Sequence, residues 1–172
     1  MDRDRDELSG EGLLQVERLG VGDVAALMSL ERLCFAYHWS EDQVRLGLER
    51  GAFHVLGIRL GGALAGYLAY STICDEMEIL NLAVHPDRRR RGLARALMAA
   101  MLRDCRERGV ARGFLDVKVS NLSAIDLYRK FGFKQCGVRK KYYPDTKEDA
   151  LLFALDIAAN GQDAPEPGVR HA

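Results

Sequence analysis

Hydrophobic and polar residues alternate in some stretches of this chain and recur every three to four positions in others. Alternation is typical of a strand with one buried face, whereas recurrence at three to four positions is typical of an amphipathic helix. The pattern predicts strands over residues 13–19, 53–60, 63–71, 78–84, 113–119, 133–138 and 149–157. It predicts helices over residues 23–35, 40–50, 92–108 and from 121 or 123 to 130.

Residues that end helices or form tight turns support these boundaries. Ser40, followed three residues later by Gln43, is a capping-box pattern. A Gly-Gly pair at residues 61–62 separates two predicted strands, and glycine tolerates the positive φ of a hairpin turn. Gly109 and Gly132 follow predicted helices at the position where glycine commonly ends them.

The order of these elements predicts a mixed α/β fold in one domain. The glycine hairpin requires an antiparallel pair, and the alternation of strands with helices in the second half implies at least one parallel pair. A chain of 172 residues suits one well-buried core. We expect the domain to span residues 13–157, with disordered tails at residues 1–12 and 158–172, because both ends are polar and lack periodicity.

The charge composition argues against two classes of partner. Lys and Arg number 25, Asp and Glu also number 25, and the formal net charge is zero, so no global field attracts nucleic acid or an anionic membrane. No apolar stretch approaches the roughly 20 residues that span a bilayer, and residues 1–7 lack the apolar core of a signal peptide. We therefore expect a cytoplasmic protein with no nucleic-acid or membrane partner, and a monomer is the default expectation.

Cysteine and histidine spacing argues against a metal site. The cysteines are Cys34, Cys74, Cys105 and Cys136, and the histidines are at positions 38, 54, 85 and 171. Neither set has the close pairs typical of metal ligands or of a redox dithiol. We interpret the cysteines as ordinary buried thiols, because a cytoplasmic domain with an ample core does not need disulfides.

Residues 85–94 connect a predicted strand to a predicted helix and include four consecutive arginines at positions 88–91. The start of a helix offers free backbone N–H groups and the positive end of the helix dipole, which together favour a bound diphosphate. Gly92 lets the backbone approach a ligand closely, Ala94 keeps the first turn small, and guanidinium groups pair with phosphate oxygens. The alternative interpretation is a solvated turn, which is the commoner fate of a run of charges.

Two spaced motifs in this chain resemble a known family. The first consists of Val84, His85, Pro86, Arg89, Gly92, Leu93 and Ala94. The second consists of Asn121, Ala124, Leu127, Tyr128, Phe131, Gly132 and Phe133. Together they are similar to the CoA-binding signatures of the GNAT acetyltransferases. The resemblance implies the acyl-CoA N-acyltransferase fold, a mixed and mostly antiparallel sheet of about seven strands with a parallel pair at strands four and five, flanked by about four helices.

The similarity covers residues 13–157 and narrows to one branch of that family. The segments that carry it are 39–41, 78–84, 120–125 and 142–150. They look like the RimI branch, bacterial acetyltransferases that act on the N-terminal alanine of a small-subunit ribosomal protein of the S18 type. The resemblance implies acetyl transfer from acetyl-CoA, with no metal, to the α-amino group of a protein N-terminus.

The resemblance also implies which residues bind the two substrates. Acetyl-CoA is expected to contact Leu82, Ala83, Val84, Arg89, Arg90, Arg91, Gly92, Leu93, Ala94, Asn121 and Tyr128. The acceptor is expected to lie in a groove formed by Trp39, Glu41, Tyr142 and Tyr143. The alternatives are that Asn121 only caps a helix and that the two tyrosines only pack at an edge.

Acetyl transfer to an amine needs a neutral amine, a stabilised oxyanion and a proton for the leaving thiolate. In the RimI branch a tyrosine supplies the proton, and Tyr128 matches its position. The matching base position holds Asp116 where the branch has glutamate, and the shorter side chain favours a water relay. Glu78, on the neighbouring strand, is the alternative base. A structural interpretation instead pairs Asp116 with Lys118 or Arg112 and buries Tyr128 in the core.

Other functions stay open at this stage. Within the family, the alternative acceptors are other protein N-termini, lysine side chains and small amines, and the departure at Asp116 keeps a non-catalytic acetyl-CoA-binding module in consideration. Outside it, the glycines at 20 and 22 weakly resemble a dinucleotide-binding turn, although two helices precede the next strand. A nucleic-acid site at residues 88–91 lacks interleaved aromatic side chains.

Overall fold

The computed structural model describes residues 14–159, and the statements below concern those residues. Its strands are β1 (Val16–Leu19), β2 (His54–Leu60), β3 (Ala63–Ile73), β4 (Glu76–Val84), β5 (Arg112–Lys118), β6 (Lys134–Arg139) and β7 (Ala150–Asp156). Its α-helices are α1 (Val24–Cys34), α2 (Glu41–Glu49), α3 (Leu93–Glu107) and α4 (Leu122–Lys130). Two 3₁₀ helices, η1 (Val21–Asp23) and η2 (Pro86–Arg88), precede α1 and α3.

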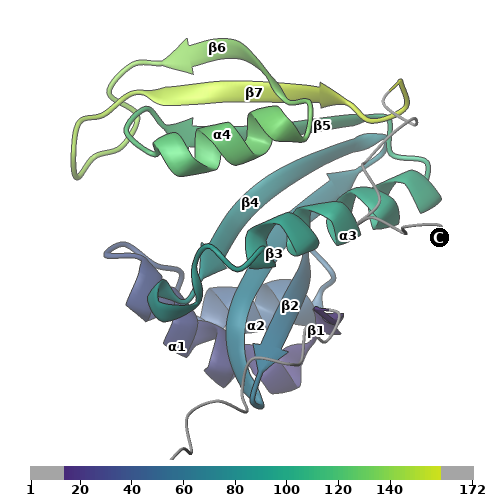
Figure 1. Cartoon of the computed structure of the whole chain (residues 1–172), viewed down its shortest axis with the longest axis vertical. Helices are drawn as coiled ribbons and strands as arrows, with labels where there is room; N and C mark the ends of the chain where they lie inside the picture. The colour runs from purple at the N-terminus through teal and green to yellow at the C-terminus, as the bar shows by residue number, and fades with distance from the viewer. Residues whose placement is uncertain (1–13, 160–172) are drawn as a thin grey trace, which may run out of the picture.

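These strands form one sheet in the order β1-β2-β3-β4-β5-β7-β6. Neighbouring strands are antiparallel except β4 and β5, which run parallel. Helices α1 and α2 lie on one face of the sheet, and α3 and α4 lie on the other (Figure 1). The predicted fold class is confirmed, including the parallel pair at strands four and five.

The central strand β3 contributes to two cores. Tyr67 and Ala69 face the core that contains α1, whereas Leu68 and Tyr70 face the core that contains α3 and α4. Residues 64–70 are therefore buried without interruption. A strand buried on both faces is a continuous apolar run, because neither set of alternate side chains meets water.

Strands β4 and β5 diverge after a short parallel ladder. Their pairing runs from Glu76 and Arg112 to Ile79 and Leu115, yet β4 continues five residues further, to Val84, and β5 three, to Lys118. On the other edge of β4, the register with β3 shifts by one residue between positions 79 and 81, which is a β-bulge. A bulge of this kind bends the strand that carries it. Beyond Ile79, the β5-facing edge of β4 has no strand partner.

The predicted helix ends and turns are confirmed. Gln43 donates its backbone N–H to Ser40 Oγ at 3.2 Å, and Ser40 donates its own to Gln43 Oε1 at 3.0 Å. The glycines at 61–62, Gly109 and Gly132 have positive φ angles. Predicted boundaries differ from the observed ones by a few residues, since β3 runs on to Ile73 and β4 starts at Glu76.

The prediction that all four cysteines are buried is wrong for two of them. Cys105 is buried and Cys34 half-buried, but Cys74 and Cys136 are exposed, and all four are free thiols. Cys74 lies in the tight turn between β3 and β4, and Cys136 lies on the edge strand β6, where one side of the strand meets solvent. The predicted N-terminal tail lies outside the described residues, as does the C-terminal tail beyond Ala159.

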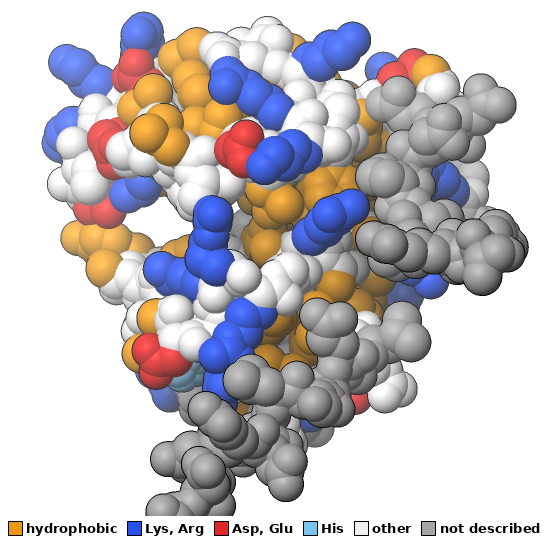
Figure 2. Space-filling model, viewed as in Figure 1, with side chains coloured by type: hydrophobic (Ala, Val, Ile, Leu, Met, Phe, Trp, Pro, Cys, Tyr) orange, Lys and Arg blue, Asp and Glu red, His pale blue; other side chains and the backbone are white. Residues whose placement is uncertain are grey.

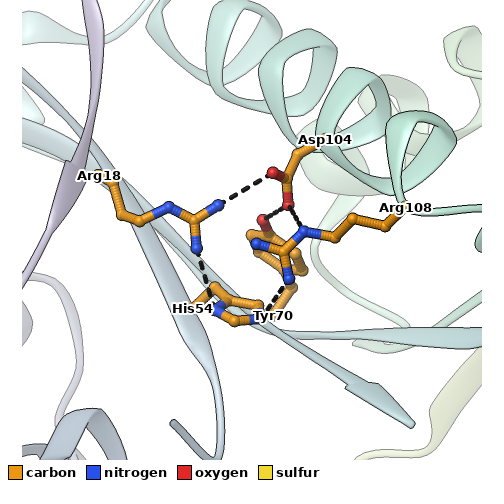
Figure 3. A network of polar contacts seen from close by, with 5 residues as sticks. All are labelled: Arg18, His54, Tyr70, Asp104 and Arg108. Atoms are coloured by element: carbon orange, nitrogen blue, oxygen red, sulfur yellow. Dashed lines mark hydrogen bonds and ion pairs between the residues drawn. The ribbon is translucent and has the colours of Figure 1, made fainter. Parts of the chain in front are cut away.

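A polar network ties β1, β2 and β3 to the C-terminal part of α3 (Figure 3). Asp104 accepts hydrogen bonds from the Tyr70 hydroxyl, from Arg18 at 2.9 Å and from Arg108 at 3.1 Å. The two guanidinium groups also lie against opposite nitrogens of the His54 ring, at 3.0 and 2.9 Å. Burial, followed by the charges of Arg108 and Arg18, lowers the pKa of His54.

Candidate active site

The loop between β4 and α3 presents a run of unpaired backbone N–H groups. Arg90 and Gly92 have φ angles of 63° and 78°, and alternation of this kind makes successive N–H groups converge on an anion. Within residues 14–159, the N–H groups of residues 90–94 make no loop or cap hydrogen bond. The arginines at positions 88–91 are exposed around them. This part of the predicted diphosphate site therefore has its donors available.

Arg89 differs from its neighbours in this loop. Its backbone N–H donates to the carbonyl of Pro86 at 3.4 Å, and its side-chain Nε donates to the carbonyl of Val84 at 3.2 Å. The Arg89 amide therefore does not belong to the free N–H groups of this loop, because the short η2 turn uses it. Its guanidinium instead lies folded against the end of β4.

The β4 edge of the site lies beyond the ladder with β5. Leu82, Ala83 and Val84 pair with β3 on one side only. The Leu82 N–H is held by the side-chain Oδ1 of Asn81 at 3.1 Å. At the start of α4, Asn121 accepts the Ala124 N–H at 3.2 Å, so Asn121 caps the helix, and its contact with acetyl-CoA stays a prediction.

Asp116 lies on β5 one residue beyond the last pair with β4. Its carboxylate accepts a hydrogen bond from Arg139 of β6 at 2.9 Å and is 24% exposed. The structural alternative was right about an ion pair but wrong about the partner. Lys118 instead binds Asp145, and Arg112 binds Glu76.

Glu78 lies on the same face of the sheet as Asp116 and on the neighbouring strand. It is exposed and forms no ion pair with any described residue. Both carboxylates line a shallow groove of about 420 Å³, whose floor includes Phe114 and Leu152 and whose wall includes Arg139. The sequence analysis placed Glu78 and Asp116 on neighbouring strands, and the β4–β5 pairing confirms this.

Tyr128 extends from α4 into the core but keeps its hydroxyl unpaired. The side chain is 6% exposed, and its ring meets the edge of Phe133 at 6.1 Å between centroids. No described residue forms a hydrogen bond with the hydroxyl, and the same residues include no fully buried side-chain polar atom that lacks a partner. The hydroxyl is therefore accessible. Burial, followed by the neighbouring Tyr143, raises the pKa of Tyr128 to about 12.

The segment between β6 and β7 holds Tyr142 and Tyr143 beside this group. Their rings lie edge to face at 5.3 Å, and Lys118 lies 4.8 Å above the ring of Tyr143. Lys118 also donates to Asp145 at 3.0 Å, which fixes the segment to the end of β5. Burial and then the charge of Asp116 raise the pKa of Tyr143 to about 12, so the hydroxyl of Tyr143 lies within the electrostatic influence of Asp116.

Trp39 and Glu41 lie on the other side of the opening, between α1 and α2 and at the start of α2. The indole packs against Phe53 at 5.4 Å, and Glu41 forms an exposed ion pair with Arg45 at 3.0 Å. Within the described chain, no contact joins these two residues to Tyr142 or to the residues around Asp116. Figure 2 shows an indentation of the surface between the β5–β7 part and the rest of the molecule, with Lys and Arg side chains on both sides.

Three residues that sequence reasoning missed shape this site. Arg139 neutralises Asp116, Lys118 holds the β6–β7 segment, and Glu31 is a buried carboxylate beneath the α1–α2 segment. Only Glu31 carried a signal in the sequence, as a charged residue among the apolar positions of a predicted helix. In residues 14–159 there is no cluster of three or more metal-ligating side chains, and no helix is long and apolar enough to cross a membrane.

Comparison with known proteins gives a consistent answer. A sequence model of the acetyltransferase (GNAT) family matches residues 24–133. The ribosomal protein bS18-alanine N-acetyltransferase of Escherichia coli strain K12 is 34% identical over 146 residues, which cover 83% of this chain and 97% of that protein. The protein of the same name from Salmonella typhimurium strain LT2 is 33% identical over 142 residues, covering 81% and 95%. A crystal structure of the Escherichia coli ribosomal-protein-S18-alanine N-acetyltransferase superposes with a TM-score of 0.78 at 31% identity, covering 91% of this chain and 99% of that one.

Proposed function

Because this chain belongs to the acetyltransferase (GNAT) family, we propose that it transfers the acetyl group of acetyl-CoA to the N-terminal alanine of ribosomal protein bS18. The observation that supports this acceptor substrate is the sequence similarity to bS18-alanine N-acetyltransferases over nearly their whole length. The open end of the β4–β5 pair supports the same chemistry. It has free backbone donors on one side and Asp116, Tyr128 and Tyr143 on the other.

The donor substrate fits the residues of the opening. The N–H groups of residues 90–94 and the positive end of α3 suit the diphosphate of CoA. A Cβ on Gly92 would meet nothing within 4 Å, so there is open space above these donors. The β5-facing edge of β4 at residues 82–84 has no strand partner and suits the amide groups of the pantetheine arm, although the Leu82 N–H and the Val84 carbonyl are already bound by the side chains of Asn81 and Arg89. We assign Asn121, at the N-cap of α4, to the same arm.

The reaction forms one C–N bond and breaks one C–S bond. The neutral α-amino group attacks the thioester carbon, the carbonyl oxygen becomes an oxyanion, and the thiolate leaves as the amine nitrogen loses a proton. In this proposal Tyr128 donates its proton toward the thiolate. Its raised pKa means that the hydroxyl is still protonated throughout the neutral range.

The amine proton passes through water to a carboxylate of the groove, Asp116 or Glu78. Arg139 holds the Asp116 carboxylate through a hydrogen bond of 2.9 Å, and carboxylates in general are weak bases. A weak base suffices for this acceptor. A protein α-amino group has a pKa of about 7.7–8.0, so roughly a tenth or more is already neutral near pH 7, whereas a lysine side chain near 10.4 is far less so.

The experiment that tests this function is a panel of acceptors assayed with acetyl-CoA for release of free CoA. The panel contains alanine-starting peptides, the same peptides starting with serine, glycine or methionine, an N-acetylated alanine peptide, a polyamine and an aminoglycoside. We expect the free alanine peptide to give the highest kcat/KM and the blocked peptide to give no turnover.

Two results would contradict the proposal at different levels. Preference for a small amine over every peptide would overturn the acceptor and leave acetyl transfer intact. Binding of acetyl-CoA without release of CoA on any acceptor would indicate a non-catalytic acetyl-CoA-binding module rather than an enzyme.

A further inference from the structure

Glu31 is a charged side chain in the α1-side core that the chemistry above does not use. It is 1% exposed, and it is the buried charged residue of the described chain. No Lys or Arg of residues 14–159 forms an ion pair with it, so hydrogen-bond donors must compensate the charge. A carboxylate held this way is expensive to bury and indicates a positional requirement.

The donors to this carboxylate come from three different elements. The Tyr67 hydroxyl of β3 donates to Oε2. Asn81 of β4 donates from Nδ2 at 3.3 and 3.2 Å to the two oxygens, and to the Tyr67 oxygen at 2.9 Å. The backbone N–H of Trp39, between α1 and α2, donates to Oε1 at 3.2 Å.

These contacts form a continuous polar connection between the two sides of the proposed site. One end is the Trp39 backbone, in the segment assigned to the acceptor. The other end is β4, because Asn81 Oδ1 accepts the N–H of Leu82 on the unpaired edge assigned to acetyl-CoA. The side chains of Glu31 and Asn81 therefore link the main chain at Trp39, in the segment assigned to the substrate amine, to the main chain of β4, the strand assigned to acetyl-CoA.

A carboxylate is the side chain that satisfies all of these donors at once. Its two oxygens offer about four acceptor sites and no donor. Glutamine in the same position would keep one acceptor oxygen, and its NH₂ group would face the N–H of Trp39 or the donors of Tyr67 and Asn81. The substitution preserves size and shape while breaking the connection.

We infer that Glu31 is a positioning residue that holds the Trp39 segment in register with β4, and so sets where the acceptor amine lies relative to the thioester. The inference rests on the proposed acceptor function only for its kinetic consequence. Its structural consequence, an anchored Trp39 amide, stands independently of which acceptor is used.

The test compares Glu31→Gln with two controls. Tyr67→Phe removes a donor to the same carboxylate but leaves the Trp39 contact, and Glu49→Gln makes the same chemical change on an exposed residue at the end of α2. The first readout is amide hydrogen exchange of residues 35–40. We expect exchange at Trp39 to accelerate about tenfold or more in Glu31→Gln and much less in either control, since only Glu31→Gln alters the group that accepts the Trp39 N–H.

The second readout separates the two substrates. In Glu31→Gln the KM for an alanine-starting peptide should rise about tenfold, while the dissociation constant of acetyl-CoA changes less than about threefold. A role confined to stability would lower the melting temperature of Glu31→Gln and Tyr67→Phe alike and leave both constants unchanged. That result, or unchanged exchange at Trp39, would overturn the inference. A wild-type enzyme inactive on the peptide, with exchange accelerated as expected, would overturn the proposed acceptor alone.

Discussion

Asp116 and Tyr128 differ in what surrounds their reactive groups. The carboxylate of Asp116 already has a guanidinium partner in Arg139, whereas the hydroxyl of Tyr128 has no partner among the described residues. Since no described polar atom is both fully buried and unpaired, the Tyr128 hydroxyl stays accessible to a substrate although its ring is buried. At the scale of single residues, Tyr128 is therefore the stronger candidate for direct contact with a substrate.

Tyr128→Phe should lower kcat about 100-fold or more and leave the dissociation constant of acetyl-CoA nearly unchanged, because it removes a general acid but keeps the ring that packs on Phe133. Steady-state kinetics and calorimetry measure the two quantities. Tyr70→Phe is the matched control, since it removes a hydroxyl that binds Asp104 in the structural network. It should lower stability and spare turnover, and a full-rate Tyr128→Phe enzyme would remove Tyr128 from the mechanism.

Asp116→Asn and Arg139→Gln separate catalysis from ion pairing. If Asp116 relays the amine proton, Asp116→Asn lowers kcat about 100-fold, whereas Arg139→Gln frees the carboxylate and keeps kcat within about threefold of wild type at pH 7. Equal losses in both variants would assign Asp116 to the ion pair. Glu78→Gln then tests the second carboxylate of the groove, and a loss there alone would make Glu78 the base.

The element that prepares the site for a diphosphate is the start of α3. Gly92, at the N-cap of α3, adopts a left-handed conformation, with φ 78° and ψ 5°, and Arg90 two residues earlier also has a positive φ. This backbone leaves the N–H groups of residues 90–94 free at the positive end of a helix of 15 residues. The motif predicted free N–H groups at the start of this helix. The Arg89 N–H is bonded within the short η2 turn, and no pattern in the sequence predicted that hydrogen bond.

Gly92→Ala should weaken acetyl-CoA binding, because an L-residue resists this φ and the loop must shift. Gly51→Ala is the matched control, with φ 63° and equally open space around its Cβ but no part in the site. Both variants should lose about 1 kcal/mol of stability in denaturant unfolding. Only Gly92→Ala should raise the dissociation constant of acetyl-CoA, by about tenfold, and equal affinities in the two variants would contradict the diphosphate assignment.

At the scale of the whole molecule, the network of Figure 3 joins residues from the first three quarters of the chain. His54 lies between Arg18 and Arg108, and burial followed by these two charges lowers its pKa. The folded protein therefore binds a proton at His54 more weakly than the unfolded chain does. The stability that neutral His54 contributes is complete above its unfolded pKa of about 6.5 and is lost as the pH falls through the folded value.

Denaturant unfolding between pH 7.5 and 5 should thus show a falling midpoint in the wild-type protein and a flatter one in His54→Gln. Asp104 does not titrate in this range. Burial raises the pKa of Asp104, but the hydrogen bond from Tyr70 and the charges of the two guanidinium groups outweigh burial and lower it. The stability that the ionised Asp104 contributes is therefore lost only below about pH 4. If the unfolding midpoint changes with pH equally in the wild-type and His54→Gln proteins, protonation of His54 does not affect stability.

By itself, the sequence determined the elements, their caps, the α/β class and the two cofactor motifs, because periodicity, helix capping and glycine turns depend on residues close together in the chain. Tertiary structure alone decided that Asp116 pairs with Arg139 rather than with Lys118 or Arg112. That choice follows from the antiparallel order β5-β7-β6, which brings residues 23 positions apart to one face. Likewise, Glu31 reaches Asn81 across 50 residues only because α1 packs on β3 and β4. Contacts between distant segments depend on packing, and local pattern holds no information about which distant partner arrives.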